Sequence, residues 1–310
     1  MDQERFPADF LQGIAPRAGK RLTGKPERNS IVREGWRMLR LLLAGERRQA
    51  VQVYCLIEQR FFLGERTWYL NLGWWEKANC FDDAGDDLAE QLGLAVGMGP
   101  GDTVLDVGFG FGDQDAYWLR RFRPARIVGL NLTPLHVREA RRRFADDRLD
   151  FRLGSATAME LDRESVDRVT ALECAFHFAT REKFFSEAWR VLRPGGRLAT
   201  ADILPRPGRH GPGARLFSRL LQHFFQVPPE NWYGMESYRG CLERSGFADP
   251  EVRSVRDQVL IPFWSALRRL ARGPRRRKGI GMPFFRLAAH VPLHWLDGLD
   301  YVLASARKPE

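Results

Sequence analysis

The sequence predicts an α/β fold built on a mainly parallel β-sheet, and three observations support this. Short apolar runs of strand length alternate with segments that have helical spacing of apolar residues over residues 102–204. A glycine-rich turn follows the first of these runs. The chain has 310 residues, 44% of them hydrophobic and 28% charged, which suits one elaborated globular domain. The expected core strands are 103–107, 126–130, 149–153, 166–172 and 197–203.

The glycine-rich turn lies within residues 103–115, which read Thr-Val-Leu-Asp-Val-Gly-Phe-Gly-Phe-Gly-Asp-Gln-Asp. Gly108, Gly110 and Gly112 stand at alternate positions between a strand and a helix. Glycines allow tight turns and close ligand approach, and a helix N-terminus offers free N–H groups. Ligands of such sheets bind beyond the carboxyl ends of the strands. The stretch therefore predicts a nucleotide-type cofactor site.

The spacing of the glycines disfavours a nicotinamide dinucleotide. That class of site uses G-x-G-x-x-G and an acid at the end of the second strand. Here the spacing is G-x-G-x-G, and the second strand ends at the neutral Asn131.

The pattern resembles class I S-adenosylmethionine (SAM)-dependent methyltransferases, whose first motif is acid-x-Gly-x-Gly-x-Gly. Asp106 stands at the acid position, and later stretches agree in register with further motifs of the family. They are residues 128–134, 154–157, 166–173 and 187–198, the last containing Leu-Arg-Pro-Gly-Gly-Arg-Leu. The resemblance implies a Rossmann-like, mostly parallel, seven-stranded sheet with helices on both faces, and SAM as cofactor. It favours the branch that acts on small molecules such as natural products, isoprenoids or sterols.

The resemblance also implies a set of cofactor contacts. They are Tyr69, Trp74, Asp106, Gly108, Gly110, Gly112, Gln114, Asn131, Leu132, Ser155, Ala156 and Glu173. Asn131 stands where much of the family has an acid for the ribose, although branches acting on isoprenoids, sterols or acyl chains also have a neutral residue there. Ser155 replaces the usual acid near the adenine amine, so Ala156 would contribute through its backbone.

The segment 69–75 resembles an Asn-x-Gly-aromatic-Trp segment that closes over the methionine end of the cofactor in related enzymes. Aromatic faces contact a sulfonium cation favourably and exclude water. The alternative is that the tryptophan pair only anchors a loop to the core.

Two residues after the fourth strand, Glu173 and His177, are the catalytic candidates. Either could accept a proton from a hydroxyl, and Glu173 also from the carbon skeleton after alkylation. The alternatives are that Glu173 only holds the cofactor or caps a turn, and that His177 is a packing residue. No set of residues predicts a metal site.

The regions outside the core predict a cap and a lid. Residues 1–95 are expected to form an N-terminal helical cap or arm, with helices over 31–43, 48–62 and 84–96. The methyltransferase core is then 96–310, with lid segments 206–236 and 262–298. The expected later elements are helices 214–226 and 237–245, a sixth strand 251–260 and a last strand 300–308.

The amino-acid composition limits the kinds of molecule that the protein is expected to bind. The net charge of +10 is compatible with an anionic ligand or lipid, or with a solvated basic surface alone, and no nucleic-acid motif is present. The aromatic and leucine-rich lid predicts a bulky hydrophobic small-molecule acceptor, methylated on oxygen or carbon, with Arg215, Arg219 or residues 275–278 as clamps for an anionic end. Alternatives are a peripheral-membrane lipid or quinone methyltransferase that uses 262–298, and a non-catalytic SAM-binding partner protein. Four scattered cysteines and no signal or membrane-spanning run predict the cytoplasm.

Overall fold

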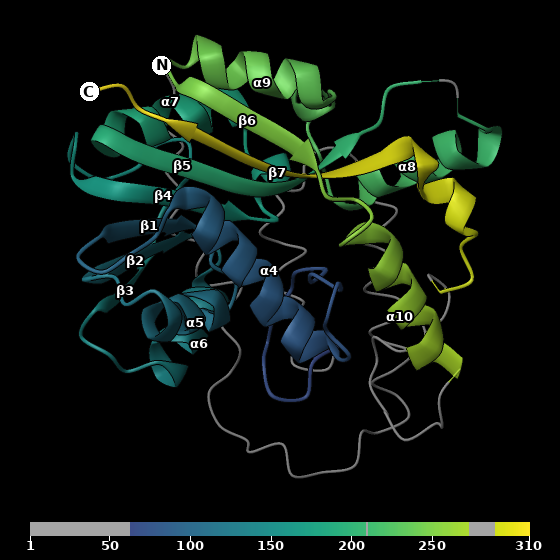
Figure 1. Cartoon of the computed structure of the whole chain (residues 1–310), viewed down its shortest axis with the longest axis horizontal. Coiled ribbons are helices and arrows are strands. Elements are labelled where there is room, and N and C mark those ends of the chain that lie inside the picture. Colours follow the sequence, from purple (N-terminus) through teal and green to yellow (C-terminus); the bar gives the residue numbers. More distant parts are fainter. Residues whose placement is uncertain (1–62, 209, 273–288) are drawn as a thin grey trace, which may run out of the picture. The chain divides into compact units, whose positions relative to one another are not determined.

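The computed structural model describes residues 63–208, 210–272 and 289–310 (Figure 1). This part of the chain contains one seven-stranded sheet in the order β3-β2-β1-β4-β5-β7-β6. All neighbouring pairs are parallel except those of β7, which runs antiparallel to β5 and β6. The strands are β1 (Thr103–Val107), β2 (Arg126–Asn131), β3 (Leu149–Leu153), β4 (Val166–Leu172), β5 (Leu192–Pro205), β6 (Ala248–Ser254) and β7 (Leu299–Arg307).

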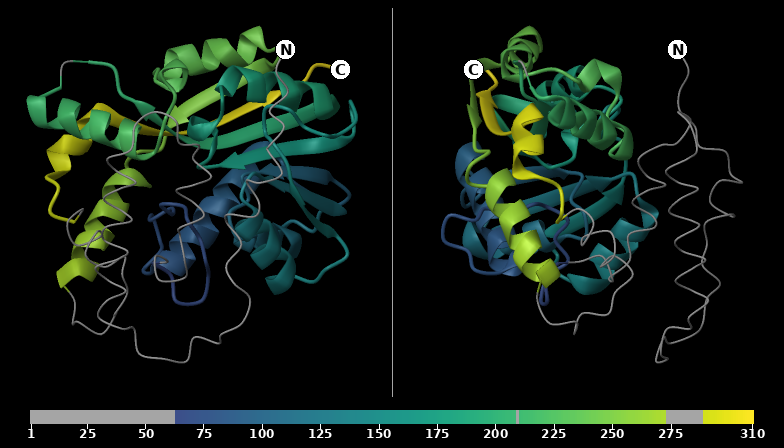
Figure 2. Two further views of the ribbon diagram at one scale, coloured as in Figure 1. Left: turned by 180° about the vertical axis from the view of Figure 1, so that it is seen from behind. Right: turned by 90° about the vertical axis from the view of Figure 1, so that its right-hand side faces the viewer.

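Helices cover both faces of the sheet because successive strand residues alternate between two apolar clusters (Figure 2). On one face, Val104 belongs to a cluster that includes residues of α4 (Phe81–Val96), α5 (Asp113–Arg121) and α10 (Leu260–Arg272). On the other face, Leu105 and Val107 pack with α7 (Arg181–Val191) and α9 (Met235–Arg244). The remaining elements are α6 (Pro134–Arg143), α8 (Pro212–Phe224) and the 3₁₀ turns η2 (Ala175–His177), η3 (Pro229–Asn231) and η4 (Leu293–Gly298). The predicted α/β fold is confirmed.

The sixth strand is shorter than the sequence suggested. We expected a strand over 251–260, whereas β6 ends at Ser254 and Leu260 already begins α10. Val259, Leu260 and Phe263 are buried on one side of this helix, so the apolar run at 259–261 follows helical rather than strand spacing.

The region expected as a cap is described only in part. The helices expected at 31–43 and 48–62 lie outside the described residues. The third, found as α4, packs across β4, β5 and β7 and thus contributes to the core of the sheet. The boundary near residue 95 stays a prediction.

Candidate active site

The glycine loop leaves the carboxyl end of β1 in a left-handed backbone conformation. The φ angles of Gly108, Gly110 and Gly112 are 76°, 58° and 86°, a region that side-chain-bearing residues rarely adopt. A Cβ on Gly108 would lie 2.6 Å from Cys174, whereas one on Gly110 would meet, among the described residues, only Leu70 Cδ1, at 3.9 Å. Gly110 therefore faces open space, where a ligand can approach the backbone.

A buried carboxyl pair lies beneath this loop. Asp106 accepts hydrogen bonds from Gln114 Nε2 (2.8 Å) and Thr170 Oγ1 (2.9 Å). Asp115, in the first turn of α5, is also fully buried and interacts with Asp106. Burial raises the pKa of Asp106 to about 7 and the pKa of Asp115 well above its ordinary value, the latter also because Asp106 is near. The pair therefore retains a proton at neutral pH. The side-chain amide nitrogen of Gln114 is engaged in its hydrogen bond to Asp106.

Residues 69–75 run past the glycine loop and the end of β4. Leu70 lies beside Gly110, and the Leu72 amide donates a 2.8 Å hydrogen bond to Glu173 Oε1. Trp74 and Trp75 are buried, and their backbone amides donate to Ala84 O and Gln258 O. The two tryptophans therefore belong to the core and anchor the segment there, while Leu70 of the same segment lies beside the glycine loop.

Tyr69 is fixed on α4. Its hydroxyl donates a 2.6 Å hydrogen bond to Asp86 Oδ1, and its ring lies where a Cβ on Gly85 would be. Burial, followed by the charge of Asp86, raises the pKa of Tyr69 well above its ordinary value. The predicted contacts of Tyr69 and Trp74 with the cofactor stay predictions.

Glu173 follows β4 directly and has a left-handed φ of 52°. Its Oε1 accepts hydrogen bonds from both Leu72 N (2.8 Å) and Tyr301 Oη (2.7 Å). Burial raises the pKa of Glu173 to about 7, against the lowering effect of these two donors. The residue as a whole has intermediate exposure.

His177 lies in η2, where its ring contacts that of Phe176 at a centroid distance of 4.1 Å. Burial lowers the pKa of His177 to about 3, and the nearby Arg181 adds to the effect. A histidine of such low pKa accepts a proton poorly near neutrality. Which of the two candidates acts as a base stays a prediction.

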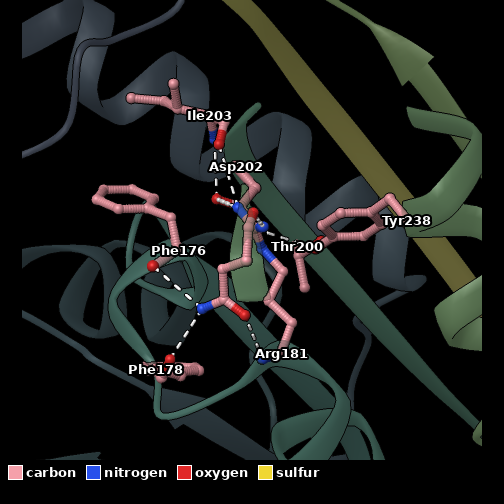
Figure 3. Close-up of polar contacts among 8 residues, drawn as sticks. Phe176, Phe178, Arg181, Thr200, Asp202, Ile203 and Tyr238 are labelled. Atoms are coloured by element: carbon pink, nitrogen blue, oxygen red, sulfur yellow. Dashed lines mark hydrogen bonds and ion pairs between the residues drawn. The ribbon is translucent and has the colours of Figure 1, made fainter. Parts of the chain in front are cut away.

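A buried polar network that we did not predict holds the segment after Glu173 (Figure 3). Arg181 is fully buried and pairs with Asp202 through Nε (2.9 Å) and Nη2 (3.2 Å). The side chain of Asn231 accepts from Arg181 N and donates to Phe178 O (2.8 Å) and Phe176 O (3.2 Å). This network fixes η2 against η3 and the end of β5. Arg181 looks in the sequence like any surface arginine at a helix start, so no local signal points to it.

The adenosine end of the predicted site lies after β2 and β3. Asn131 Oδ1 accepts a hydrogen bond from Thr133 N (2.9 Å), and Asn131 Nδ2 lies 3.5 Å from His136 Nδ1. Both ends of the Asn131 side-chain amide therefore already have a partner at the start of α6. Leu132 is partly exposed beside it. Ser155 forms a turn with Thr157, and the side chain of Ala156 is buried. The ribose and adenine contacts of these residues remain predictions.

Among the residues that the structure describes, no group of three or more His, Cys, Asp or Glu side chains could hold a metal ion. In the same part of the chain, no helix combines the length and apolar character needed to cross a membrane.

The strand order and the glycine loop after β1 define the class I methyltransferase fold, and comparisons with known proteins agree. Residues 105–200 match the model of the methyltransferase domain family. The chain is 43% identical over 257 residues to erythromycin 3''-O-methyltransferase of Saccharopolyspora erythraea, covering 78% of this chain and 84% of that protein. It is 27% identical to 27-O-demethylrifamycin SV methyltransferase of Amycolatopsis mediterranei, covering 79% and 93%.

The structure of geranyl diphosphate C-methyltransferase from Streptomyces coelicolor superposes with a TM-score of 0.63. It is 18% identical over 84% of this chain and 96% of that one, which supports the fold. The chain therefore belongs to the SAM-dependent methyltransferases. It is an enzyme that uses SAM to methylate small molecules.

Proposed function

We propose that this enzyme transfers the methyl group of SAM to a hydroxyl oxygen of a bulky, largely apolar natural product of the macrolide or ansamycin type. The two O-methyltransferases to which the chain is similar act on erythromycin and rifamycin precursors, and each is matched over most of its length. Methylation of carbon is the second candidate, and the isoprenoid enzyme that favours it shares the fold at only 18% identity.

The position of Glu173 is the observation that carries this proposal. A neutral hydroxyl is a weak nucleophile, so its methylation is faster when a base accepts the hydroxyl proton as the new oxygen–carbon bond forms. Glu173 lies at the carboxyl end of β4, next to the loop that would hold the cofactor, and its pKa of about 7 suits this task. The acceptor oxygen forms a bond to the methyl carbon, the carbon–sulfur bond breaks, and the hydroxyl proton passes to Glu173. The products are the methyl ether and S-adenosylhomocysteine.

The substitution Glu173→Gln tests the assignment. The amide keeps the shape but accepts no proton, so we expect kcat to fall by about 10²–10⁴-fold while the affinity for SAM is retained. The enzyme is incubated with SAM and a panel of demethylated macrolides and ansamycins, and mass spectrometry measures the mass of one CH₂ that a methylated acceptor gains. His177→Gln is the matched control and should lose less than about tenfold. Full activity of Glu173→Gln would show that another group is the base.

We also propose that the enzyme works in the cytoplasm and that its lid contacts an anionic lipid surface. The thiols of Cys80, Cys174 and Cys241 are free, as in a reducing compartment. The predicted lid segments 206–236 and 262–298 together hold twelve Arg and Lys residues against three acids, which are Glu230, Glu236 and Asp297. On α8, Leu216 and Leu220 are 53% and 54% exposed, one turn apart. Apolar side chains beside arginines suit an anionic membrane surface.

Vesicle co-sedimentation tests the lipid contact. The protein should sediment with phosphatidylglycerol-containing vesicles at low salt and not with phosphatidylcholine vesicles. Leu216→Gln/Leu220→Gln should weaken this, whereas Leu94→Gln/Leu153→Gln, which alters two other exposed leucines, should not. Equal sedimentation of both double variants would contradict the proposed surface.

A further inference from the structure

We propose that Tyr301 is a positioning residue for methyl transfer. Together with the Leu72 amide it binds Oε1 of Glu173 and leaves Oε2 to receive the proton of the acceptor. The inference rests on the proposed role of Glu173 as the base. It adds a function for β7, a strand far from the glycine loop in sequence.

Both donors converge on a single oxygen. Tyr301 Oη lies 2.7 Å and Leu72 N lies 2.8 Å from Glu173 Oε1. Within the described ranges no hydrogen bond joins Oε2 to another residue. Because each carboxylate oxygen offers about two acceptor sites, Oε1 is filled by the protein and Oε2 is the oxygen with capacity left.

Tyr301 is well built to act as a fixed donor. It is fully buried in β7, opposite Ile203 of β5, and its backbone oxygen accepts from Val255 N. Burial, with the carboxylate of Glu173 beside it, raises the pKa of Tyr301 well above its ordinary value. The hydroxyl therefore remains protonated throughout the neutral range and donates to Glu173.

The sheet holds the backbone of Glu173, whose amide donates to Ala201 O of β5, and the side chain is held by the hydrogen bonds from Tyr301 and Leu72. The residue follows β4 in a left-handed conformation, outside any helix or strand. In the part of the chain that the structure describes, the other ionisable groups that interact with it are Asp202 of β5, whose charge is paired with Arg181, and the buried Cys174 thiol. The substitution of Tyr301 by Phe leaves both of these groups unaltered, so the effect of its hydroxyl can be isolated.

The variant Tyr301→Phe removes only that hydroxyl. A hydrogen bond to the ionised carboxylate lowers its pKa, so its loss should move the titration of Glu173 upward by about 0.5–1 pH unit. Carbon-13 NMR of protein labelled at glutamate Cδ reads this titration without any acceptor, and the signal of Glu173 is identified by its absence in Glu173→Gln. The acid limb of kcat/KM for the methylated acceptor should move by the same amount.

Tyr238→Phe is the matched control. Tyr238 is equally buried, but its hydroxyl contacts Thr200 and Asp202. A merely structural role for Tyr301 would lower the melting temperature in both variants and leave the Glu173 titration alone. Replacing tyrosine throughout by 3-fluorotyrosine, a stronger donor, should move the midpoint downward, which gives a second test if Tyr301→Phe does not fold.

The outcomes separate the two proposals. If Glu173→Gln is inactive but the Glu173 midpoint is the same in Tyr301→Phe and the unaltered enzyme, or moves as far in Tyr238→Phe, the role of Tyr301 is wrong and the base assignment stands. If Glu173→Gln is fully active, the base assignment itself fails, and the role of Tyr301 in methyl transfer falls with it.

Discussion

Asp106 and Asp115 place two interacting carboxyl groups in the protein interior next to the glycine loop. Both side chains are fully buried, and the described residues supply hydrogen-bond donors mainly to Asp106, from Gln114 and Thr170. Two neighbouring carboxylates cannot both ionise cheaply in such surroundings. The sequence motif identified Asp106, but it gave no reason to single out Asp115, because the contact depends on how α5 is placed on β1.

The substitution Asp115→Asn should make the protein less sensitive to alkaline pH. A carboxyl whose pKa is raised in the folded state stays protonated there after the unfolded chain has released its proton, so its contribution to stability is lost as pH rises through the folded pKa. Between pH 6 and pH 9 we expect the free energy of unfolding of the unaltered protein to fall by on the order of 1–3 kcal/mol more than that of Asp115→Asn. Urea unfolding at the two pH values measures this. A difference that does not vary with pH would contradict the coupled pair.

At the scale of elements, the acceptor side of the site depends on contacts between segments distant in sequence. Glu173 binds Leu72 and Tyr301, which are 101 and 128 positions away. Strands and core helices were predictable because their apolar periodicity is local. The contacts of Glu173 with Leu72 and Tyr301 were not predictable, because they depend on the β5–β7 pairing and on the anchored 69–75 segment, which bring the two residues to the end of β4.

Breaking the buried Arg181–Asp202 pair tests how η2 is held. Arg181→Met leaves Asp202 as an uncompensated buried charge, and we expect a loss of about 3–5 kcal/mol in the free energy of unfolding. The exposed pair Arg193–Asp167 is the control, and Arg193→Gln should cost less than about 1 kcal/mol. Denaturant unfolding compares the two. Equal losses would mean that the buried network contributes no more than a surface ion pair.

At the scale of the whole molecule, the mixed seven-stranded sheet brings the carboxyl ends of β1, β2 and β4 to one edge. The predicted motifs 103–115, 128–134 and 166–173 lie at those ends, which is why the fold and the cofactor class followed from the sequence. Outside the parallel strands, the apolar run at 259–261 leads into α10 instead of ending a strand. Burial against distant elements decided that outcome, and apolar character alone could not.

The central claim is that the glycine loop binds SAM, and calorimetry with S-adenosylhomocysteine tests it most directly. Gly110→Ala places a methyl group in the open space beside the loop. Gly101→Ala places one in a turn that also has a positive φ, where no described residue lies within 4 Å. Both variants carry backbone strain, but only the first obstructs the expected ligand. We predict one bound ligand per chain, unchanged affinity in Gly101→Ala, and at least about tenfold weaker binding in Gly110→Ala. Absence of binding to the unaltered protein, or equal affinities in the two variants, would contradict the claim.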